Sequence, residues 1–243
     1  TLRQFSPCRT PAEPLTNMAN EHISKRFDAE LEGVRSRVLQ MGGLVEQQIS
    51  RAMESLANGD MVLADQVIAD DHRVNALEVG IDDDCVHIID KRQPTAGDLR
   101  MILTIIKTIT DLERIGDEAA KIARFAIKVY DSDRIVAPRY NEIKYMSGLA
   151  TKMLRESLDS FARLDVSGAA AVARQDMEVD EEFHLITRHL ITFMMEDPRT
   201  ISTFIDLLFV VKAIERIGDH AKNMSEYVVF MVKGKDVRHT SIE

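Results

Sequence analysis

Two pairs of acidic residues stand out in the sequence because each pair lies inside the same five letters, ERIGD. The first copy places Glu113 and Asp117 four residues apart, and the second copy places Glu215 and Asp219 at the same spacing. Residues four apart lie on one face of a helix, so each pair presents two neighbouring carboxylates. Like charges at this spacing destabilise a helix by roughly 0.2–0.5 kcal/mol, and a cation bound between them would remove the repulsion.

Each ERIGD segment also carries a glycine between its two acids, Gly116 in the first copy and Gly218 in the second. A glycine in the interior of a helix costs about 1 kcal/mol relative to alanine. A residue without a side chain allows a neighbouring helix or a ligand to approach closely. Two copies that share these unfavourable choices therefore indicate that something offsets their cost.

A second group of oxygen-bearing side chains lies on the helix-forming segment before each ERIGD copy, beside a stripe of apolar residues. If the two segments face each other, four such side chains meet in each repeat. Oxygen ligands without cysteine or histidine favour magnesium, manganese, calcium or iron over zinc. The predicted metal ligands are Asp71, Asn75, Glu113 and Asp117 in the first repeat, and Asp176, Asp180, Glu215 and Asp219 in the second.

A simpler alternative is that the acidic pairs are only surface charge on a helical scaffold. Lys121 follows Asp117 by four residues and could neutralise it within the helix. An internal duplication also preserves residues by descent, whatever they do. The sequence leaves both interpretations open.

Other functional classes find little support in the sequence. The formal net charge of −9 argues against a nucleic-acid-binding protein, which needs a basic face. The chain has no GxSxG, HExxH or glycine-rich phosphate-loop motif, and its one Glu-x-x-His, Glu181 to His184, lacks the partner that a di-iron site requires. We expect no enzyme, and a metal-dependent phosphohydrolase is the alternative in that class.

Long helices are the expected elements, because only 11 glycines, 6 prolines and no tryptophan occur in 243 residues. Apolar residues recur at spacings of three and four, with turn-forming residues between the periodic stretches. The expected helices are about 21–57, 60–92, 96–131, 138–163, 167–195 and 199–233. No apolar run reaches the length of a membrane-spanning helix. Cys8 and Cys85 have no spacing that predicts a disulfide or a zinc site.

The last three expected helices repeat the first three. Residues 41–75 align without gaps with residues 146–180, and each repeat ends in a helix that carries ERIGD. A repeat of about 100 residues suits two similar three-helix bundles. We therefore expect an all-α fold with bundles at 21–134 and 135–235, a disordered or non-native leader at 1–20 and a C-terminal tail at 236–243.

The segments "LERIGDEAAKIA", "IERIGDHAKNMS", "MGGLVEQQ", "KRQPTAGDLR" and "MMEDPRTI" resemble the PhoU family over nearly the whole chain beyond the leader. The resemblance implies a cytoplasmic, dimeric negative regulator of the phosphate-starvation response. It also implies partners: the ATPase of the phosphate transporter and a membrane sensor histidine kinase, so that the protein is peripheral to the membrane. Family members carry metal clusters on E(D)xxxD motifs, which here match Glu113/Asp117 and Glu215/Asp219.

The two repeats are expected to differ in their affinity for a cation. Asn75 replaces a carboxylate that the second repeat has as Asp180, and an amide oxygen is a weaker ligand. Glu78 or Asp82 could compensate, whereas Phe183, the residue that matches Glu78, cannot coordinate a metal. Unless Glu78 or Asp82 compensates in this way, the second repeat should hold metal more tightly than the first.

Overall fold

The computed structural model describes residues 16–131, 140–235 and 237, with side chains from Arg26 onward. Every helix expected from the sequence is present, and a short 3₁₀ turn, η1 (Pro198–Thr200), precedes the last one. The helices are α1 (Thr16–Asn58), α2 (Met61–Arg92), α3 (Ala96–Asp131), α4 (Tyr140–Arg163), α5 (Val166–Glu196) and α6 (Ile201–Lys233).

Only the first boundary differs by more than a few residues from expectation. Helix α1 begins at Thr16, so it extends into the predicted leader, whose residues 1–15 lie outside the described part of the chain. The predicted junction of the two bundles falls within residues 132–139, and the tail at 236–243 is described only at Val237.

The turns form where polar residues can cap the next helix. Asp60 accepts a hydrogen bond from the backbone N–H of Leu63 at the start of α2, and Asp165 caps α5 in the matching way through Ser167. Asp197 and Pro198 together start the 3₁₀ turn that leads into α6. The first turn of each repeat is therefore capped by an aspartate at the matching position, whereas within the described part of the chain the 3₁₀ turn occurs only in the second repeat.

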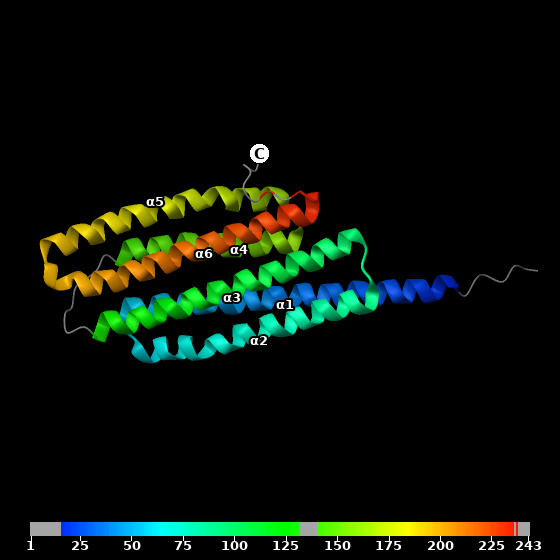
Figure 1. Cartoon of the computed structure of the whole chain (residues 1–243), viewed down its shortest axis with the longest axis horizontal. Coiled ribbons are helices and arrows are strands. Elements are labelled where there is room, and N and C mark those ends of the chain that lie inside the picture. Colours follow the sequence, from blue (N-terminus) through cyan, green and yellow to red (C-terminus); the bar gives the residue numbers. More distant parts are fainter. Residues whose placement is uncertain (1–15, 132–139, 236, 238–243) are drawn as a thin grey trace, which may run out of the picture.

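Figure 1 shows two three-helix bundles, α1–α3 and α4–α6, lying side by side along their length. The most extensive contact between the bundles joins α3 to α6, and a smaller one joins α1 to α4. The two central helices are antiparallel: Phe125 of α3 stacks on Phe209 of α6, whereas Lys107 lies over Tyr227 further along. Over the described residues, no helix has the long apolar stretch that a membrane crossing requires.

One hydrophobic core runs through both bundles and their junction. Its members include large side chains that are completely or almost completely buried, among them Met41, Ile49, Leu56, Ile81, Ile105, Leu112, Ile115 and Phe161. Burial of one such side chain contributes about 1.5–3 kcal/mol. The core therefore fixes α3 and α6, which carry the ERIGD segments, at the centre of the molecule.

Candidate functional site

Both ERIGD segments lie near the middle of their helices, with the apolar half turned inward. Gly116 and Gly218 are buried, as are the isoleucines that precede them. Glu113 and Glu215 are half-buried, whereas Asp117 and Asp219 are exposed. The acids therefore occupy the shoulders of the apolar stripes, as the helical period predicted.

In the first bundle, α2 and α3 bring a group of acids together, which we call the first cluster: Asp71, Glu78, Glu113 and Asp117, with the amide of Asn75. Burial raises the pKa of Glu113, and the negative charges of Asp117, Glu78 and Asp71 raise it further. Burial likewise raises the pKa of Glu78 and of Asp71. These carboxylates repel one another in a partly desolvated place, which is the situation that a cation would relieve.

Gly116 allows α2 and α1 to approach α3 closely at the first cluster. A Cβ atom at this position would lie 3.1 Å from Gln48 Oε1 and 3.4 Å from Asp71 Oδ1. Gln48 donates from Nε2 to Asp71 Oδ1 at 3.2 Å, and this hydrogen bond partly offsets the raised pKa of Asp71. The buried oxygens Gln48 Oε1 and Asn75 Oδ1 have no hydrogen-bond partner in the described part of the chain. Two unpaired oxygens beside four carboxylates are suitable donors for a hard cation.

In the second bundle, lysines already neutralise part of the matching group, the second cluster: Asp176, Asp180, Glu215 and Asp219. Lys222 Nζ lies 2.5 Å from Asp176 Oδ2, and Lys212 Nζ lies 2.6 Å from Glu215. Burial raises the pKa of Asp180, and the charge of Asp176 adds to the shift. The pKa of Asp219 is also raised, by desolvation first and then by Glu215.

From the sequence we expected the second bundle to bind a cation more tightly, because its predicted ligands include one more carboxylate. The two ion pairs cancel this excess of negative charge. Residues 26–131 and 140–235 contain no ion pair to any carboxylate of the first cluster, and Lys121 pairs with Glu118 rather than with Asp117. Thr110 and Ala120 occupy the positions that match the two lysines. Glu78 brings the number of carboxylates in the first cluster to four, the same number as in the second, and its compensation for Asn75 in metal binding stays a prediction. The first cluster is the more negative of the two.

Neither cluster is a finished coordination site. Within the described residues, no three His, Cys, Asp or Glu side chains are already arranged to hold a metal ion. The eight ligands named from the sequence therefore stay a prediction, although each set of four gathers between the two helices that were expected to present it.

Gln48 and the two lysines were not predicted from the sequence. Gln48 comes from a third helix, α1, and its counterpart in the second repeat is Met153, so the repeat gave no signal for it. Lys212 and Lys222 precede and follow the second ERIGD by a few residues. Comparing the two repeats at those positions would have indicated a difference in charge.

The fold and the clusters define a class of protein: two sequence-related three-helix bundles in tandem, each with acids between its second and third helices. The PhoU domain matches this chain twice, at residues 38–126 and 143–228. A relative from Pseudomonas aeruginosa, a phosphate-specific transport system accessory protein PhoU homolog, is 47% identical over 91% of each chain. The phosphate-specific transport system accessory protein PhoU of Escherichia coli strain K12 is 47% identical over 90% of each chain.

Solved structures agree with these matches. The crystal structure of PhoU from Pseudomonas aeruginosa superposes with a TM-score of 0.82 at 46% identity, covering 86% of this chain and 100% of that one. The phosphate transport system regulatory protein PhoU from Streptococcus pneumoniae gives a TM-score of 0.81 at 27% identity, covering 87% and 99%. The chain belongs to the PhoU family.

Proposed function

We propose that this protein is an accessory regulator of phosphate transport that represses the phosphate-starvation response when phosphate is plentiful. The observation that carries the proposal is the pair of PhoU domains, which together cover most of the chain. Support comes from relatives that are named for the phosphate-specific transport system and align over about nine-tenths of this chain.

The proposed mode of action is binding rather than catalysis. A regulator of this kind works by binding one state of its partner more tightly than the other, which shifts the population of the two states. The proposed partners are the ATPase subunit of the phosphate transporter and the membrane sensor histidine kinase, both reached from the cytoplasm. A homodimer is the proposed form of the protein. The resemblance to the PhoU family supports these assignments.

We further propose that the clusters hold metal ions. In the first bundle the ligands are Glu113, Asp117, Asp71 and Asn75, with Glu78 beside them, and the donor chemistry fits iron, manganese or magnesium better than zinc. In the second bundle the ligands are Glu215, Asp219, Asp176 and Asp180, where Lys212 and Lys222 compete with a cation. A bound cation would neutralise the repulsion among the carboxylates and hold the second and third helices together.

A gene deletion tests the regulatory role. Loss of the protein should derepress phosphate-starvation genes in phosphate-rich medium, and the intact chain supplied in trans should restore repression. Unchanged repression in the deletion strain would contradict the proposed function.

Carboxylate variants separate regulation from the two alternatives. Glu113→Gln with Asp117→Asn should lower metal content and weaken repression, whereas Asp65→Asn with Asp159→Asn, two exposed acids outside the clusters, should do neither. A scaffold with only surface charge predicts no change from either double variant. A metal-dependent phosphohydrolase predicts turnover of a phosphoester that the first double variant loses.

A further inference from the structure

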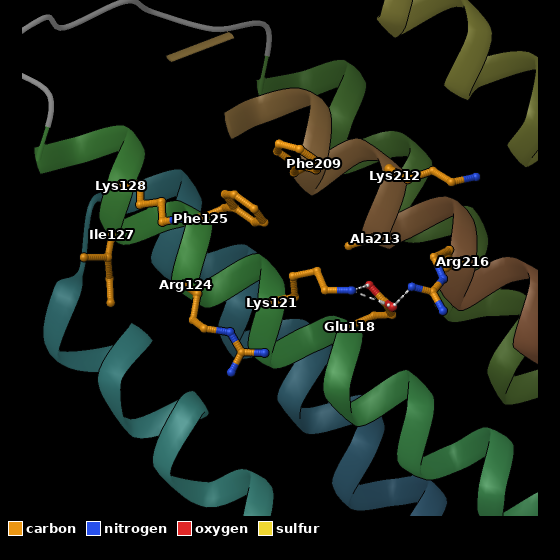
Figure 2. Close-up of a pocket in the computed structure, with 10 residues that line it drawn as sticks. All are labelled: Glu118, Lys121, Arg124, Phe125, Ile127, Lys128, Phe209, Lys212, Ala213 and Arg216. Atoms are coloured by element: carbon orange, nitrogen blue, oxygen red, sulfur yellow. Dashed lines mark hydrogen bonds and ion pairs between the residues drawn. The ribbon is translucent and has the colours of Figure 1, made fainter. Parts of the chain in front are cut away.

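An open groove lies between α3 and α6, near the C-terminal end of α3 (Figure 2). Its volume is about 900 Å³, within the range of pockets that bind small molecules. Among the residues that the structure describes, its lining combines apolar side chains with five cationic ones and one carboxylate, that of Glu118. Such a concentration of positive charge is unexpected in a protein whose formal net charge is −9.

Two stacked aromatic rings form a ledge in the groove. The rings of Phe125 and Phe209 are 5.0 Å apart and only 13° from parallel. Lys128 Nζ lies 4.7 Å from the centre of the Phe125 ring, while Phe209 remains 50% exposed. An exposed aromatic ring at the end of a stack offers a flat surface on which another planar ring can continue the stack.

Cationic groups converge beside this ledge. Figure 2 shows Lys121 and Arg216 pointing at Glu118 from opposite sides; Lys121 donates to it at 2.8 and 2.9 Å, and Arg216 lies 2.6 Å away. Glu118 is 3% exposed, so it holds both cations in place, and two positive charges share one negative charge. Ammonium and guanidinium groups carry more donors than one carboxylate can satisfy. The groove therefore retains the capacity to bind an anion.

The other two cationic side chains, those of Lys212 and Arg124, do not point toward Glu118. Lys212 points away from the groove in Figure 2, toward Phe183, whose ring centre is 5.3 Å from its Nζ. Arg124 points away from the two aromatic rings in Figure 2. Three cationic side chains of the groove therefore remain to bind an anion: Lys121, Arg216 and Lys128.

The internal repeat provides a comparison. The matching place at the other end of the α3–α6 contact has Lys107 where the groove has Phe209, and Lys107 lies over Tyr227 and Phe230 at 5.4 and 5.2 Å. There the cation covers the aromatic rings of its own chain. The exposed ledge with its separate cations is thus a property of one end of the contact and not a consequence of the duplication.

We propose that this groove binds a nucleoside polyphosphate, with the base stacked on Phe209 and the phosphates on Lys121, Arg216 and Lys128. A planar ring and several negative charges in one ligand match the two features that lie side by side here. An acidic helix of a partner protein would satisfy the charges but would leave the flat ledge without a matching planar group. None of the ten lining side chains is placed to distinguish one base from another, because the only acceptor among them, Glu118, is occupied.

The test is calorimetric titration of the full chain with ATP in EDTA at low salt, so that the carboxylate clusters cannot bind metal–nucleotide complexes. ATP and GTP should bind with similar affinity, and both adenosine and tripolyphosphate should bind more weakly than ATP. Phe209→Ala should weaken ATP binding about tenfold or more, because one base–aromatic stack is lost. Lys121→Gln should weaken it by about tenfold and reduce its dependence on salt.

Lys107→Ala is the matched control, because it removes a cation beside aromatic rings at the equivalent place outside the groove. It should leave ATP affinity unchanged. The proposal is overturned if ATP does not bind at millimolar concentration, or if Phe209→Ala binds ATP as the unchanged chain does. Equal binding of tripolyphosphate and ATP would also overturn it, and so would competition by an acidic helical peptide that ATP cannot displace. None of these outcomes depends on the regulatory role.

Discussion

Lys222 of α6 and Gln48 of α1 occupy equivalent roles beside the aspartates of the two clusters. Lys222 lies 2.5 Å from Asp176, a buried carboxylate of α5, and supplies a full positive charge. Asp71, its counterpart on α2, receives only an amide hydrogen bond from Gln48. A full positive charge attracts a carboxylate by a direct Coulomb interaction, whereas a neutral amide donor offers only the weaker interaction of a dipole. These two residues therefore set which bundle most needs an external cation.

The order of metal binding should follow this difference. We expect Asp117→Ala to remove the tighter of two manganese-binding events and Asp219→Ala to remove the weaker one, as followed by electron paramagnetic resonance of the chelator-treated protein. Lys222→Ala should strengthen binding in the second bundle by about tenfold or more, because Asp176 then lacks its internal counter-ion. If Asp219→Ala instead removes the tighter manganese-binding event, this order is wrong, and the second bundle binds metal more tightly, as the sequence predicted.

The single described cysteine is chemically protected. Cys85 is fully buried in α2, and burial raises the pKa of its thiol to about 12, with Asp82 and Asp84 adding to the shift. Only the thiolate reacts readily with alkylating reagents. In a Cys8→Ser variant, iodoacetamide at pH 8 should therefore leave Cys85 unlabelled until the chain is unfolded in denaturant, as mass spectrometry would detect. Rapid labelling of the native chain would show that α2 opens locally.

The sequence could predict which residues lie beside the apolar stripe of each helix, but not which contacts they make there. The period of 3.6 residues places Glu113 and Asp117 correctly, because only backbone geometry is involved. The pairing of Lys121 with Glu118 instead of Asp117 depends on side-chain rotamers and on Arg216, which arrives from the other bundle. Contacts between helices far apart in sequence leave no periodic signal.

At the scale of elements, α1 and α2 are tied by a bidentate ion pair. Arg92 donates to both carboxylate oxygens of Glu30, at 3.0 Å from Nε and 2.8 Å from Nη2. The hydrogen bonds from Arg92 hold the pKa of Glu30 below its ordinary value. A carboxyl group with a lowered pKa in the folded state stabilises the fold above its unfolded pKa, and this contribution is lost as the pH falls through the folded value.

Glu30→Gln should therefore lower the free energy of unfolding at pH 7 by about 0.5 kcal/mol, the size expected for a partly exposed ion pair. The difference from the unchanged chain should shrink below about pH 4 as Glu30 becomes protonated. Urea denaturation at both pH values measures it. Glu54→Gln, a change at an exposed acid of the same helix, is the control and should have no effect at pH 7. A deficit that does not shrink at all between pH 7 and pH 3 would mean that packing, not charge, is lost.

At the scale of the molecule, the two bundles are joined by contacts that do not follow the repeat. His220 Nδ1 lies 2.7 Å from Asp111 Oδ1, a buried pair across the α3–α6 contact, and Glu118 pairs with Arg216 nearby. The matching residues differ: Glu118 corresponds to His220, and Asp111 to Ala213. The sequence repeat therefore predicted each bundle and could not predict how they dock, because docking depends on residues in which the repeats have diverged.

The second contact between the bundles depends on a close approach at Gly42. A Cβ atom there would lie 2.5 Å from Leu158 Cδ1 and 3.3 Å from its Cγ, so a side chain at position 42 would require Leu158 to move. At the next residue, Gly43, a Cβ atom would meet nothing within 4 Å, so this position offers a matched comparison. Both residues lie inside α1, where alanine is favoured over glycine by about 1 kcal/mol.

Gly43→Ala should accordingly raise the free energy of unfolding by about 0.5–1 kcal/mol. Gly42→Ala gains the same helix propensity but forces Leu158 out of its place, and overpacking of this kind typically costs about 1–3 kcal/mol. The two neighbouring variants should therefore shift the midpoint of urea denaturation in opposite directions. If both variants raise the midpoint equally, Leu158 can move without cost. The α1–α4 contact is then loosely packed, and the α3–α6 contact is the one that holds the bundles together.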